Sequence, residues 1–496
     1  METLAAYKDY LALSVKLGSV QALLNWDQQT HMPKRGIAFR SQVSGALAKM
    51  AFERMVSDEL GGLIEKLEGQ DDLSEAERAS VHRVGKNYRR RKAVPPSFVE
   101  EVTVARSQSQ AAWTEARRTS DFSRFEPHLE KMVGFARRLA DYIGYEDHPY
   151  DALLEDFEPG MTSARLHDII KPLREQLVPF LERLMTEGTA PDPAPLIGAF
   201  DLETQRRLAR RALEIVLYDF DAGALDDVAH PFTTTIGFGD VRVTNRYLEE
   251  HLGPGLYAAL HEGGHALYNQ GMGEELVWLQ LSRGSSNGIH ESQSRMIENQ
   301  VGRSRPFWVH FQPILAEFFP QFAGTSVDAL HGAANIVNPS MIRVEADEVT
   351  YNFHIMLRFE LEMGLLDGSI AVSDLPRIWN ETMERYLGIV PANDAEGVLQ
   401  DVHWSMGMFG YFPSYMLGNL YAAQMLTTLR QAIPALDDQI AAGDFEPLLA
   451  WLRKEVHSLG AIFEPAELIE RITGSPLDPE HLVRYISEKY SGIYKL

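Results

Sequence analysis

The stretch Leu256–Gln270, LYAALHEGGHALYNQ, limits what this chain can fold into more than any other part of the sequence. Leucine, alanine and glycine recur in it at helical spacing, which predicts an α-helix with one apolar face. On such a helix His261 and His265 lie one above the other on the same face, because they are four residues apart. Two imidazoles so placed can hold one divalent metal ion, with Glu262 beside them to handle the protons of a water molecule. The stretch therefore predicts a metal site on a helix.

The alternative is that HEGGH occurs by chance in an ordinary packed helix. Two features favour the metal site. Gly263 and Gly264 each destabilise a helix interior by about 1 kcal/mol relative to alanine, which indicates that a neighbour approaches closely there. An apolar environment is also a poor place for two imidazoles without polar partners.

Composition narrows the choice of ligands and partners. The 496 residues include no cysteine, so histidines and carboxylates must bind any metal. A net charge of −23 argues against nucleic acid or an anionic membrane as a partner, since both require a basic surface. The first residues form an amphipathic pattern rather than a signal peptide, and no apolar run is long enough to span a bilayer. We therefore expect a soluble, cytoplasmic protein.

A third metal ligand is expected after the HEGGH helix. A catalytic zinc ion requires three protein ligands and one open position. The candidates are His290, Glu291 and Glu298. Glu291 fits best because it lies near the start of the following helix, where its carboxylate can point back at the first helix. Glu298 is more readily a supporting or surface group.

The best β signal lies just before the HEGGH helix. Two short runs, residues 232–236 and 241–247, flank a turn that contains glycine, which predicts a hairpin. In the second run Asp240, Arg242 and Thr244 alternate with valines, so their side chains share one face. This is either an ordinary half-exposed hairpin or a strand that borders a cleft and offers its edge to an extended peptide.

Further along, the pattern predicts a long helix from Ser340 to about Leu366. Arg343 and Asp347 would share one face of it. Such a polar stripe is ordinarily solvated, but an arginine held by an aspartate four residues on is also a clamp for a carboxylate.

Polar and aromatic side chains then crowd into a segment rich in glycine. This density of hydrogen-bonding groups on a turn-prone segment is more typical of the wall of a site than of a core. The residues are Gln400, Asp401, His403, Tyr411 and Tyr415.

Taken together, the motifs resemble one family. DVRVT, HEGGH, HESQ, IRVEAD and GVLQDVHW, in this order, resemble the five signature motifs of the carboxypeptidase Taq family of zinc metallocarboxypeptidases. They span Asp240 to Trp404. The flanking stretches LLNWDQQTHMP, YDALLEDFEPGMT and GYFPSYMLGNLYAAQ also resemble that family, so the resemblance covers nearly the whole chain. Each motif alone is weakly specific, but five in order are highly specific.

The resemblance implies a mainly α fold, a large helical subunit with a deep active-site groove, similar to the neurolysin and angiotensin-converting-enzyme peptidases. A small β-hairpin or sheet would lie beside the metal helix. The whole chain, residues 1–496, would form a single peptidase domain with its catalytic motifs within 240–415. The N-terminal helices, about residues 1–110, are a candidate cover for the groove. The resemblance further implies a homodimer and one zinc ion per subunit, with cobalt as another possible ion.

It also implies an activity, the release of single amino acids from peptides with a free C-terminus, at broad specificity. His261, His265 and Glu291 then resemble the metal ligands and Glu262 the general base. Arg343 resembles a clamp for the substrate's terminal carboxylate. The most plausible donors to an oxyanion are His403, Tyr411 and Tyr415, and the residues expected only to line the site are Asp240, Arg242, Thr244, Gln400 and Asp401.

Two other functions stay open at this point. A metal-dependent oligopeptidase or dipeptidase would use the same HExxH chemistry, and only an endopeptidase tolerates a substrate with both ends blocked. An inactive binding scaffold is the other alternative. The intact HEGGH and HESQ motifs argue against it, because an idle site has no physical need for both imidazoles and the base.

Overall fold

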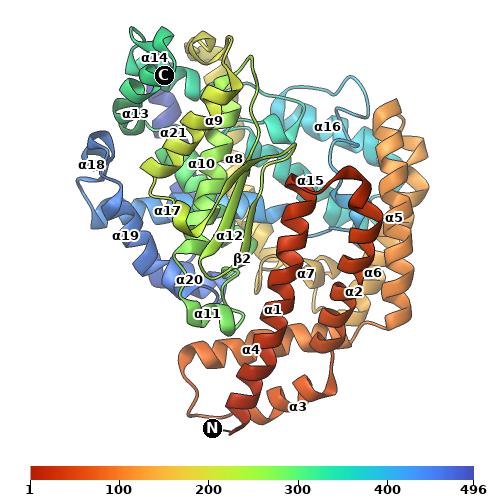
Figure 1. Ribbon diagram of the computed structural model, residues 1–496. Coiled ribbons are helices and arrows are strands. Elements are labelled where there is room, and N and C mark those ends of the chain that lie inside the picture. Colours follow the sequence, from red (N-terminus) through yellow and green to blue (C-terminus); the bar gives the residue numbers. More distant parts are fainter. Residues whose placement is uncertain (1) are drawn as a thin grey trace. The chain divides into compact units, whose positions relative to one another are not determined.

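The computed structural model describes residues 2–496 and is mainly helical with one small sheet, as the sequence predicts (Figure 1). The chain divides into two compact units. The first comprises residues up to Arg91, Asp192–Ala334 and Tyr421–Pro476, and the second comprises Lys92–Pro191, Asn335–Leu420 and Leu477–Leu496. Within residues 2–496, no helix combines the length and apolar character needed to cross a bilayer.

The first unit carries the HEGGH helix and the sheet. Its helices are α1 (Glu2–Thr30), α2 (Ile37–Met55), α3 (Asp58–Leu67), α4 (Glu75–Lys92), α9 (Leu202–Ile215), α10 (Leu252–Gln270), α11 (Glu274–Trp278), α12 (Asn287–Arg295), α13 (Arg305–Phe318), α14 (Val327–Ala334), α18 (Leu436–Ala442), α19 (Glu446–Glu455) and α20 (Pro465–Thr473). The strands are β1 (Leu225–Asp227), β2 (Thr233–Gly237) and β3 (Asp240–Asn245). One of the boundaries between the units falls within α17 (Pro413–Ala432).

Helix α10 is the centre of the first unit. Most of its side chains are buried, because α9, α12, β2 and β3 all pack against it. Only a helix that is apolar on nearly every side can occupy such a position. The sequence predicted this helix correctly, and it ends at Gln270, just before Gly271.

Helix α12 starts at a well-defined cap. The Ser286 hydroxyl accepts a hydrogen bond from the backbone N–H of Ile289 at 3.0 Å, which satisfies one of the free donors of the first turn. After Arg295 the chain widens into a π-helix, Met296–Val301. Widened turns of this kind are frequent at functional sites.

The predicted hairpin is confirmed, but its place in the sheet is not the expected one. Strands β2 and β3 pair antiparallel, and Gly239 in the turn has φ +75°, which favours glycine. The sheet order is β1-β3-β2, with β1 parallel to β3. Strand β3 is therefore the middle strand, and β1 covers its edge over Val243–Asn245. The hypothesis that β3 offers its edge to a peptide is wrong for these residues, and for Asp240–Arg242, with which β1 does not pair, it stays a prediction. Periodicity predicts which face a side chain takes, whereas it does not predict which strands are neighbours.

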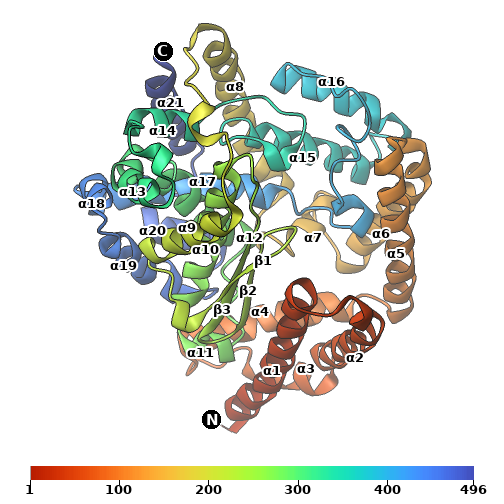
Figure 2. The same ribbon diagram turned by 45° about the horizontal axis from the view of Figure 1, so that its top comes forward.

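Helices α1 and α2 form an antiparallel pair, seen in Figure 2. Helix α1 also packs against β2, whereas α2 has no buried side chain in the described chain. The ends of the pair are joined through Arg40, whose guanidinium donates to Asp27 at 2.5 Å.

Among its described residues, the second unit contains helices and connecting segments but no strand. Its helices are α5 (Pro96–Thr119), α6 (Glu126–Ile143), α7 (Pro149–Leu154), α8 (Ser163–Glu187), α15 (Tyr351–Asp367), α16 (Leu375–Leu387) and α21 (Glu480–Tyr494). Helix α15 is buried along almost its whole length, including Arg358 and Glu362, which are both 0% exposed. Two ionisable groups in such a helix are costly unless they have partners.

The long helix predicted from Ser340 begins eleven residues later, at Tyr351. Arg343 lies instead in a short 3₁₀ turn, Arg343–Glu345. The physical reason is Asp347, whose carboxylate accepts hydrogen bonds from the backbone N–H groups of Val349 and Thr350 at 2.9 and 3.0 Å. An aspartate that binds the next backbone donors starts a helix after itself rather than continuing one.

Candidate active site

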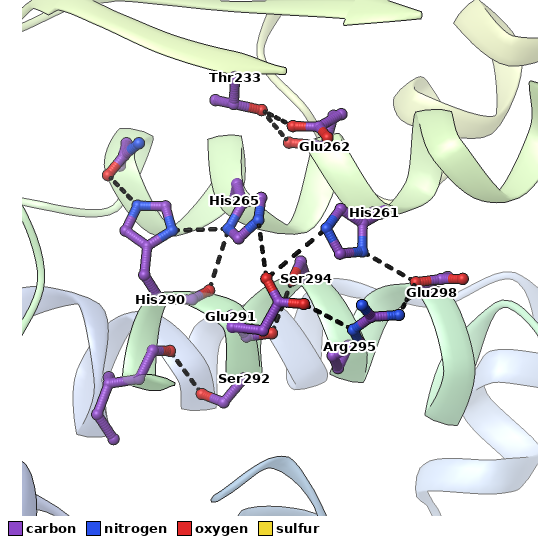
Figure 3. Close-up of polar contacts among 12 residues, drawn as sticks. Thr233, His261, Glu262, His265, His290, Glu291, Ser292, Ser294, Arg295 and Glu298 are labelled. Carbon is purple, nitrogen blue, oxygen red and sulfur yellow. Dashed lines mark hydrogen bonds and ion pairs between the residues drawn. The ribbon is translucent and has the colours of Figure 1, made fainter. Parts of the chain in front are cut away.

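The structure brings the three predicted metal ligands together (Figure 3). His261 and His265 lie on one face of α10, with ring centroids 4.9 Å apart. Glu291 on α12 faces both of them. Its Oε2 atom lies 3.8 Å from Nε2 of His261 and 3.4 Å from Nε2 of His265.

These spacings suit one divalent ion. A tetrahedral ion with bonds of about 2.0–2.2 Å separates its ligand atoms by roughly 3.3–3.6 Å. The three ligand atoms all lie within 4.8 Å of one another, so small side-chain shifts are enough to place them around a metal. The two imidazoles and one carboxylate leave a fourth position for water or substrate.

A chain of hydrogen bonds sets the tautomer of His265. Nδ1 of His265 lies 2.6 Å from Nδ1 of His290 and 3.1 Å from the backbone oxygen of His290. Nε2 of His290 lies 3.0 Å from the side-chain oxygen of Asn269, an acceptor, so His290 carries its proton on Nε2. Nδ1 of His290 therefore accepts, and His265 carries its proton on Nδ1. This leaves the Nε2 lone pair of His265 free for a metal.

His261 is held by a carboxylate. Its Nδ1 lies 2.9 Å from Oε2 of Glu298, which also accepts from Arg295, while the other Glu298 oxygen accepts from Arg303. A carboxylate behind a ligating imidazole orients the ring and makes its free nitrogen a better ligand. Glu298 is buried, so it supports the site rather than lying on the surface.

Arg295 keeps both carboxylates ionised. It donates to Glu291 at 2.7 Å and to Glu298 at 3.1 Å. Burial opposes ionisation of both groups, but Arg295 together with His261 and their other charged neighbours holds the pKa of each carboxyl well below its usual range. An ionised Glu291 is the form that can bind a metal.

Gly264 allows the two helices to approach. A Cβ atom there would lie 2.5 Å from the backbone oxygen of Gln293 and 2.6 Å from Cα of Ser294. Both contacts are with the backbone of α12, the helix that carries Glu291. The close approach expected from the two glycines is thus confirmed at this position, and it is what lets Glu291 reach the imidazoles.

Glu262 points from α10 toward the sheet. The hydroxyl of Thr233 on β2 lies 2.8 Å from both the backbone oxygen and Oε2 of Glu262 (Figure 3). The hydroxyl therefore fixes the orientation of the Glu262 side chain against β2. Sequence reasoning missed Thr233, because a hydroxyl in a strand gives no signal of what it contacts.

The polar side chains of β3 contact other residues of the first unit. Arg242 donates two hydrogen bonds to Asp240, at 2.7 and 2.8 Å, and its guanidinium lies over the Trp26 ring of α1. Thr244 is fully buried, and its hydroxyl binds the backbone of Phe232. These contacts brace the sheet, and a contact of the three residues with substrate stays a prediction.

In the second unit, Arg343 is paired with Asp401 rather than with Asp347. Its Nη2 atom lies 2.9 Å from the Asp401 carboxylate, and its Nη1 donates to the hydroxyl of Tyr351 at 3.0 Å. The predicted partner four residues on is wrong, because the chain between Arg343 and Asp347 is not α-helical. The arginine itself is only 6% exposed.

Asp401 also binds a second arginine, Arg358 of α15, through its other oxygen, with Nε at 2.7 Å. Gln400 connects the same groups, since its oxygen accepts from the Arg343 backbone and from the Arg358 side chain, each at 2.8 Å. Burial opposes ionisation of Asp401, but the two guanidinium groups hold its pKa well below the usual range. Two cations and one anion leave one excess positive charge in this hydrogen-bonded group. Sequence reasoning missed Arg358, although a charged residue within the apolar stretch FHIMLRF was a usable signal.

The remaining candidates form an aromatic cluster. His403 packs against Tyr411 at a centroid distance of 5.3 Å, and Tyr411 packs against Tyr415 at 5.2 Å. Tyr415 in turn lies under the Arg343 guanidinium, 4.9 Å from it. Burial lowers the pKa of His403 to about 4, so this imidazole is neutral at physiological pH. The structure thus brings Arg343, Gln400 and Asp401 together with the three predicted donors.

Comparison with known proteins places the chain in the family that the sequence motifs resemble. The family described as Carboxypeptidase Taq (M32) metallopeptidase matches residues 6–490. The chain is 42% identical over 477 residues to Carboxypeptidase 1 of Bacillus subtilis (strain 168), a match that covers 96% of this chain and 95% of that protein. It is 40% identical over 491 residues to Thermostable carboxypeptidase 1 of Pyrococcus furiosus, covering 99% and 98%.

Solved structures of carboxypeptidases are also similar to this chain. The M32 carboxypeptidase from Deinococcus radiodurans R1 matches with a TM-score of 0.97 and 36% identity, over 100% of both chains. Trypanosoma cruzi Metallocarboxypeptidase 1 matches with a TM-score of 0.94 and 33% identity, over 99% of both chains.

Proposed function

Because this chain belongs to the carboxypeptidase Taq (M32) family of metallopeptidases and is a metal-dependent carboxypeptidase, we propose that it releases single amino acids from peptide C-termini with one zinc ion per subunit. The ion would be held by His261, His265 and Glu291. The observation that carries this proposal is the spacing of their ligand atoms, all within 4.8 Å of one another. Two imidazole nitrogens and one carboxylate oxygen suit zinc, and cobalt is an alternative with the same preferences.

The chemistry we propose is general-base hydrolysis. A divalent ion, when bound, polarises the scissile carbonyl and makes a water molecule acidic enough to ionise near neutral pH. Glu262 would take the proton from the attacking water and then pass it to the leaving amine. The hydroxyl of Thr233, 2.8 Å from Oε2 of Glu262, supports this role, because it holds the carboxylate in one orientation.

Arg343 would receive the terminal carboxylate of the substrate. A guanidinium offers two parallel donors that match a carboxylate, which a lysine does not. The excess positive charge of the group formed by Arg343, Arg358 and Asp401 supports this assignment, because a buried group with a net positive charge favours an anionic ligand. The free carboxylate is what distinguishes the end of a peptide from its interior.

The oxyanion formed on the carbonyl oxygen would accept a hydrogen bond from His403, Tyr411 or Tyr415. A neutral imidazole or a phenol can donate one hydrogen bond without itself carrying charge. The lowered pKa of His403 supports its neutral form. Asp240, Arg242, Thr244, Gln400 and Asp401 are proposed as residues that line or brace the site.

The remaining proposals concern the domain organisation, the location and the oligomeric state of the protein. We propose a single peptidase domain with a deep groove, similar in shape to neurolysin and angiotensin-converting-enzyme peptidases, with the N-terminal helices of about residues 1–110 as its cover. We further propose a cytoplasmic homodimer of broad specificity. The absence of cysteine is compatible with a cytoplasmic location, where structural disulfides are rare.

The test is mass spectrometry of a peptide mixture incubated with the protein, with and without a chelator. A ladder of C-terminal truncations that disappears with the chelator and returns with added zinc is expected. Glu262→Gln is the matched control, which should bind metal but produce no ladder. Cleavage of peptides blocked at both ends would favour an oligopeptidase instead, and the absence of any cleavage would favour an inactive scaffold.

A further inference from the structure

Glu362 is a buried acid that the reaction described above does not use. It lies on α15, is 0% exposed, and accepts three hydrogen bonds. One carboxylate oxygen accepts from the indole Nε1 of Trp404 at 2.8 Å. The other accepts from the hydroxyl of Tyr150 at 2.9 Å and from the backbone N–H of Gly410 at 3.1 Å.

Two of these three donors flank the candidate oxyanion donors. Trp404 follows His403 directly, and Gly410 directly precedes Tyr411. A single carboxylate therefore binds both ends of the turn that runs from residue 403 to residue 411. The rings of His403 and Tyr411, at the two ends of this turn, lie 5.3 Å apart.

The first part of the turn is a 3₁₀ helix, His403–Met406, and the backbone N–H groups of Gly407 and Met408 donate to the backbone oxygens of Trp404 and His403, each at 3.0 Å. The part that follows contains two glycines. Gly407 and Gly410 have φ values of +71° and +87°, in the region that favours glycine, and glycine leaves the backbone free to move. A Cβ atom at Gly410 would lie 2.8 Å from the backbone nitrogen of Leu154 on α7. The turn thus packs directly on α7, the helix that also carries Tyr150.

A carboxylate is the group that this position requires. The indole and the backbone amide can only donate, so each needs an acceptor oxygen. A glutamine has one oxygen, and whichever way its amide turns, either Trp404 or Gly410 faces an NH₂ group instead. Burying an acid is costly, and burial raises the pKa of Glu362 to about 7. Retaining such a group in a helix core indicates a gain elsewhere.

We infer that Glu362 is a positioning residue for the carboxypeptidase reaction, because by binding Trp404 and Gly410 it fixes the separation of His403 and Tyr411. The inference rests on the proposed function of those two side chains. Glu362 touches neither substrate nor metal in this role and acts only through the turn.

The test compares two variants. One changes the Glu362 carboxylate itself, and the other removes one of its three hydrogen-bond donors. Glu362→Gln releases one end of the turn. Tyr150→Phe removes the donor that does not belong to the turn, and it is the matched control. For both, kcat, KM and bound zinc are measured with a peptide that has a free C-terminus.

We expect Glu362→Gln to lower kcat by about tenfold to a hundredfold, the effect of misplacing a catalytic group by about 1 Å. KM should change less than kcat, and zinc content should be unchanged, because the hydrogen-bond partners of Arg343 and of the metal ligands lie outside residues 403–411. Tyr150→Phe should retain kcat within about twofold. Adding Tyr411→Phe to Glu362→Gln should lower kcat less than the product of the two single losses, since both changes act on one arrangement.

An unchanged kcat in Glu362→Gln, together with a lowered kcat in Tyr411→Phe, would overturn the role of Glu362 and leave the proposed function intact. Unchanged kcat in both His403→Ala and Tyr411→Phe would remove the catalytic role of the turn, and the role of Glu362 with it, while the chelator-sensitive ladder would still stand. Equal losses in Glu362→Gln and Tyr150→Phe would indicate a purely structural acid. If Glu362→Gln does not fold, Trp404→Phe deletes the donor at one end of the turn and should give the same loss of kcat with a smaller change in KM.

Discussion

Gly264 of α10 lies against the backbone of α12 in the candidate metal centre, and this close approach leads to a sharp prediction. In Gly264→Ala the new Cβ atom would lie 2.5 Å from the Gln293 oxygen and 2.6 Å from Cα of Ser294. Both neighbours are backbone atoms, which cannot rotate away. The two helices must therefore move apart.

The magnitude follows from the distances. Non-bonded carbon atoms approach to about 3.5 Å, so relieving the contact requires a shift of about 1 Å. Overpacking of this kind costs about 1–3 kcal/mol, and alanine regains about 1 kcal/mol of helix propensity, so the free energy of unfolding should fall by no more than about 2 kcal/mol. Metal coordination is less tolerant, because ligand distances must hold within about 0.2 Å. Since Glu291 lies on the displaced helix, zinc affinity should fall by about a hundredfold or more.

The neighbouring glycine is the control. In Gly263→Ala the new Cβ atom meets Cδ2 of Leu213 at 2.5 Å, which is the far end of a flexible side chain that can turn aside. Zinc affinity of each variant is measured by competition with a coloured chelator, and stability by urea unfolding of the metal-free protein. Gly263→Ala should bind zinc nearly as the wild type does. Equal zinc affinity in the two variants would refute the reasoning that the approach of α12 to Gly264 places Glu291.

Three further outcomes are expected. Glu298→Gln should weaken zinc binding by about tenfold to a hundredfold, because the carboxylate behind His261 is lost, and an unchanged affinity in the competition assay would contradict this. Arg343→Ala should reduce kcat/KM for free-acid peptides by about a hundredfold but hardly affect C-terminally amidated peptides, and equal losses on both substrates would exclude the carboxylate clamp. Burial raises the pKa of Glu362 from 4.5 to about 7, so the folded protein retains a proton that the unfolded chain loses. The stability from this group is therefore complete below pH 4.5 and is lost as pH rises to about 7, by roughly 3 kcal/mol. Glu362→Gln should gain stability relative to the wild type over that interval in urea unfolding, and parallel pH curves would count against it.

Local sequence patterns predicted what depends on neighbours along the chain. The period of apolar residues predicted α10, and the spacing of His261 and His265 predicted that they share a face. Alternation predicted the hairpin of β2 and β3. These features follow from backbone geometry alone, and the structure confirms them.

Contacts between distant segments were not predictable in this way. Arg343 pairs with Asp401, 58 residues away, rather than with Asp347, and no local spacing encodes that choice. Strand β1 has the sequence Leu-Asp-Asp, which carries no strand signal, yet its pairing makes β3 the central strand. The predicted start of α15 was wrong for a local reason. The Asp347 side chain accepts hydrogen bonds from backbone N–H groups that a continuous helix would use.

The charge balance around Asp401 has a consequence for how the enzyme behaves in a concentrated digest. If Arg343, with its excess positive charge, binds the terminal carboxylate of a peptide, it also binds the carboxylates of the shortened peptide and of the freed amino acid. Each turnover therefore generates two competitors for the site that the next substrate needs. Progress curves should bend before substrate is exhausted, and removing free amino acids during the reaction should straighten them.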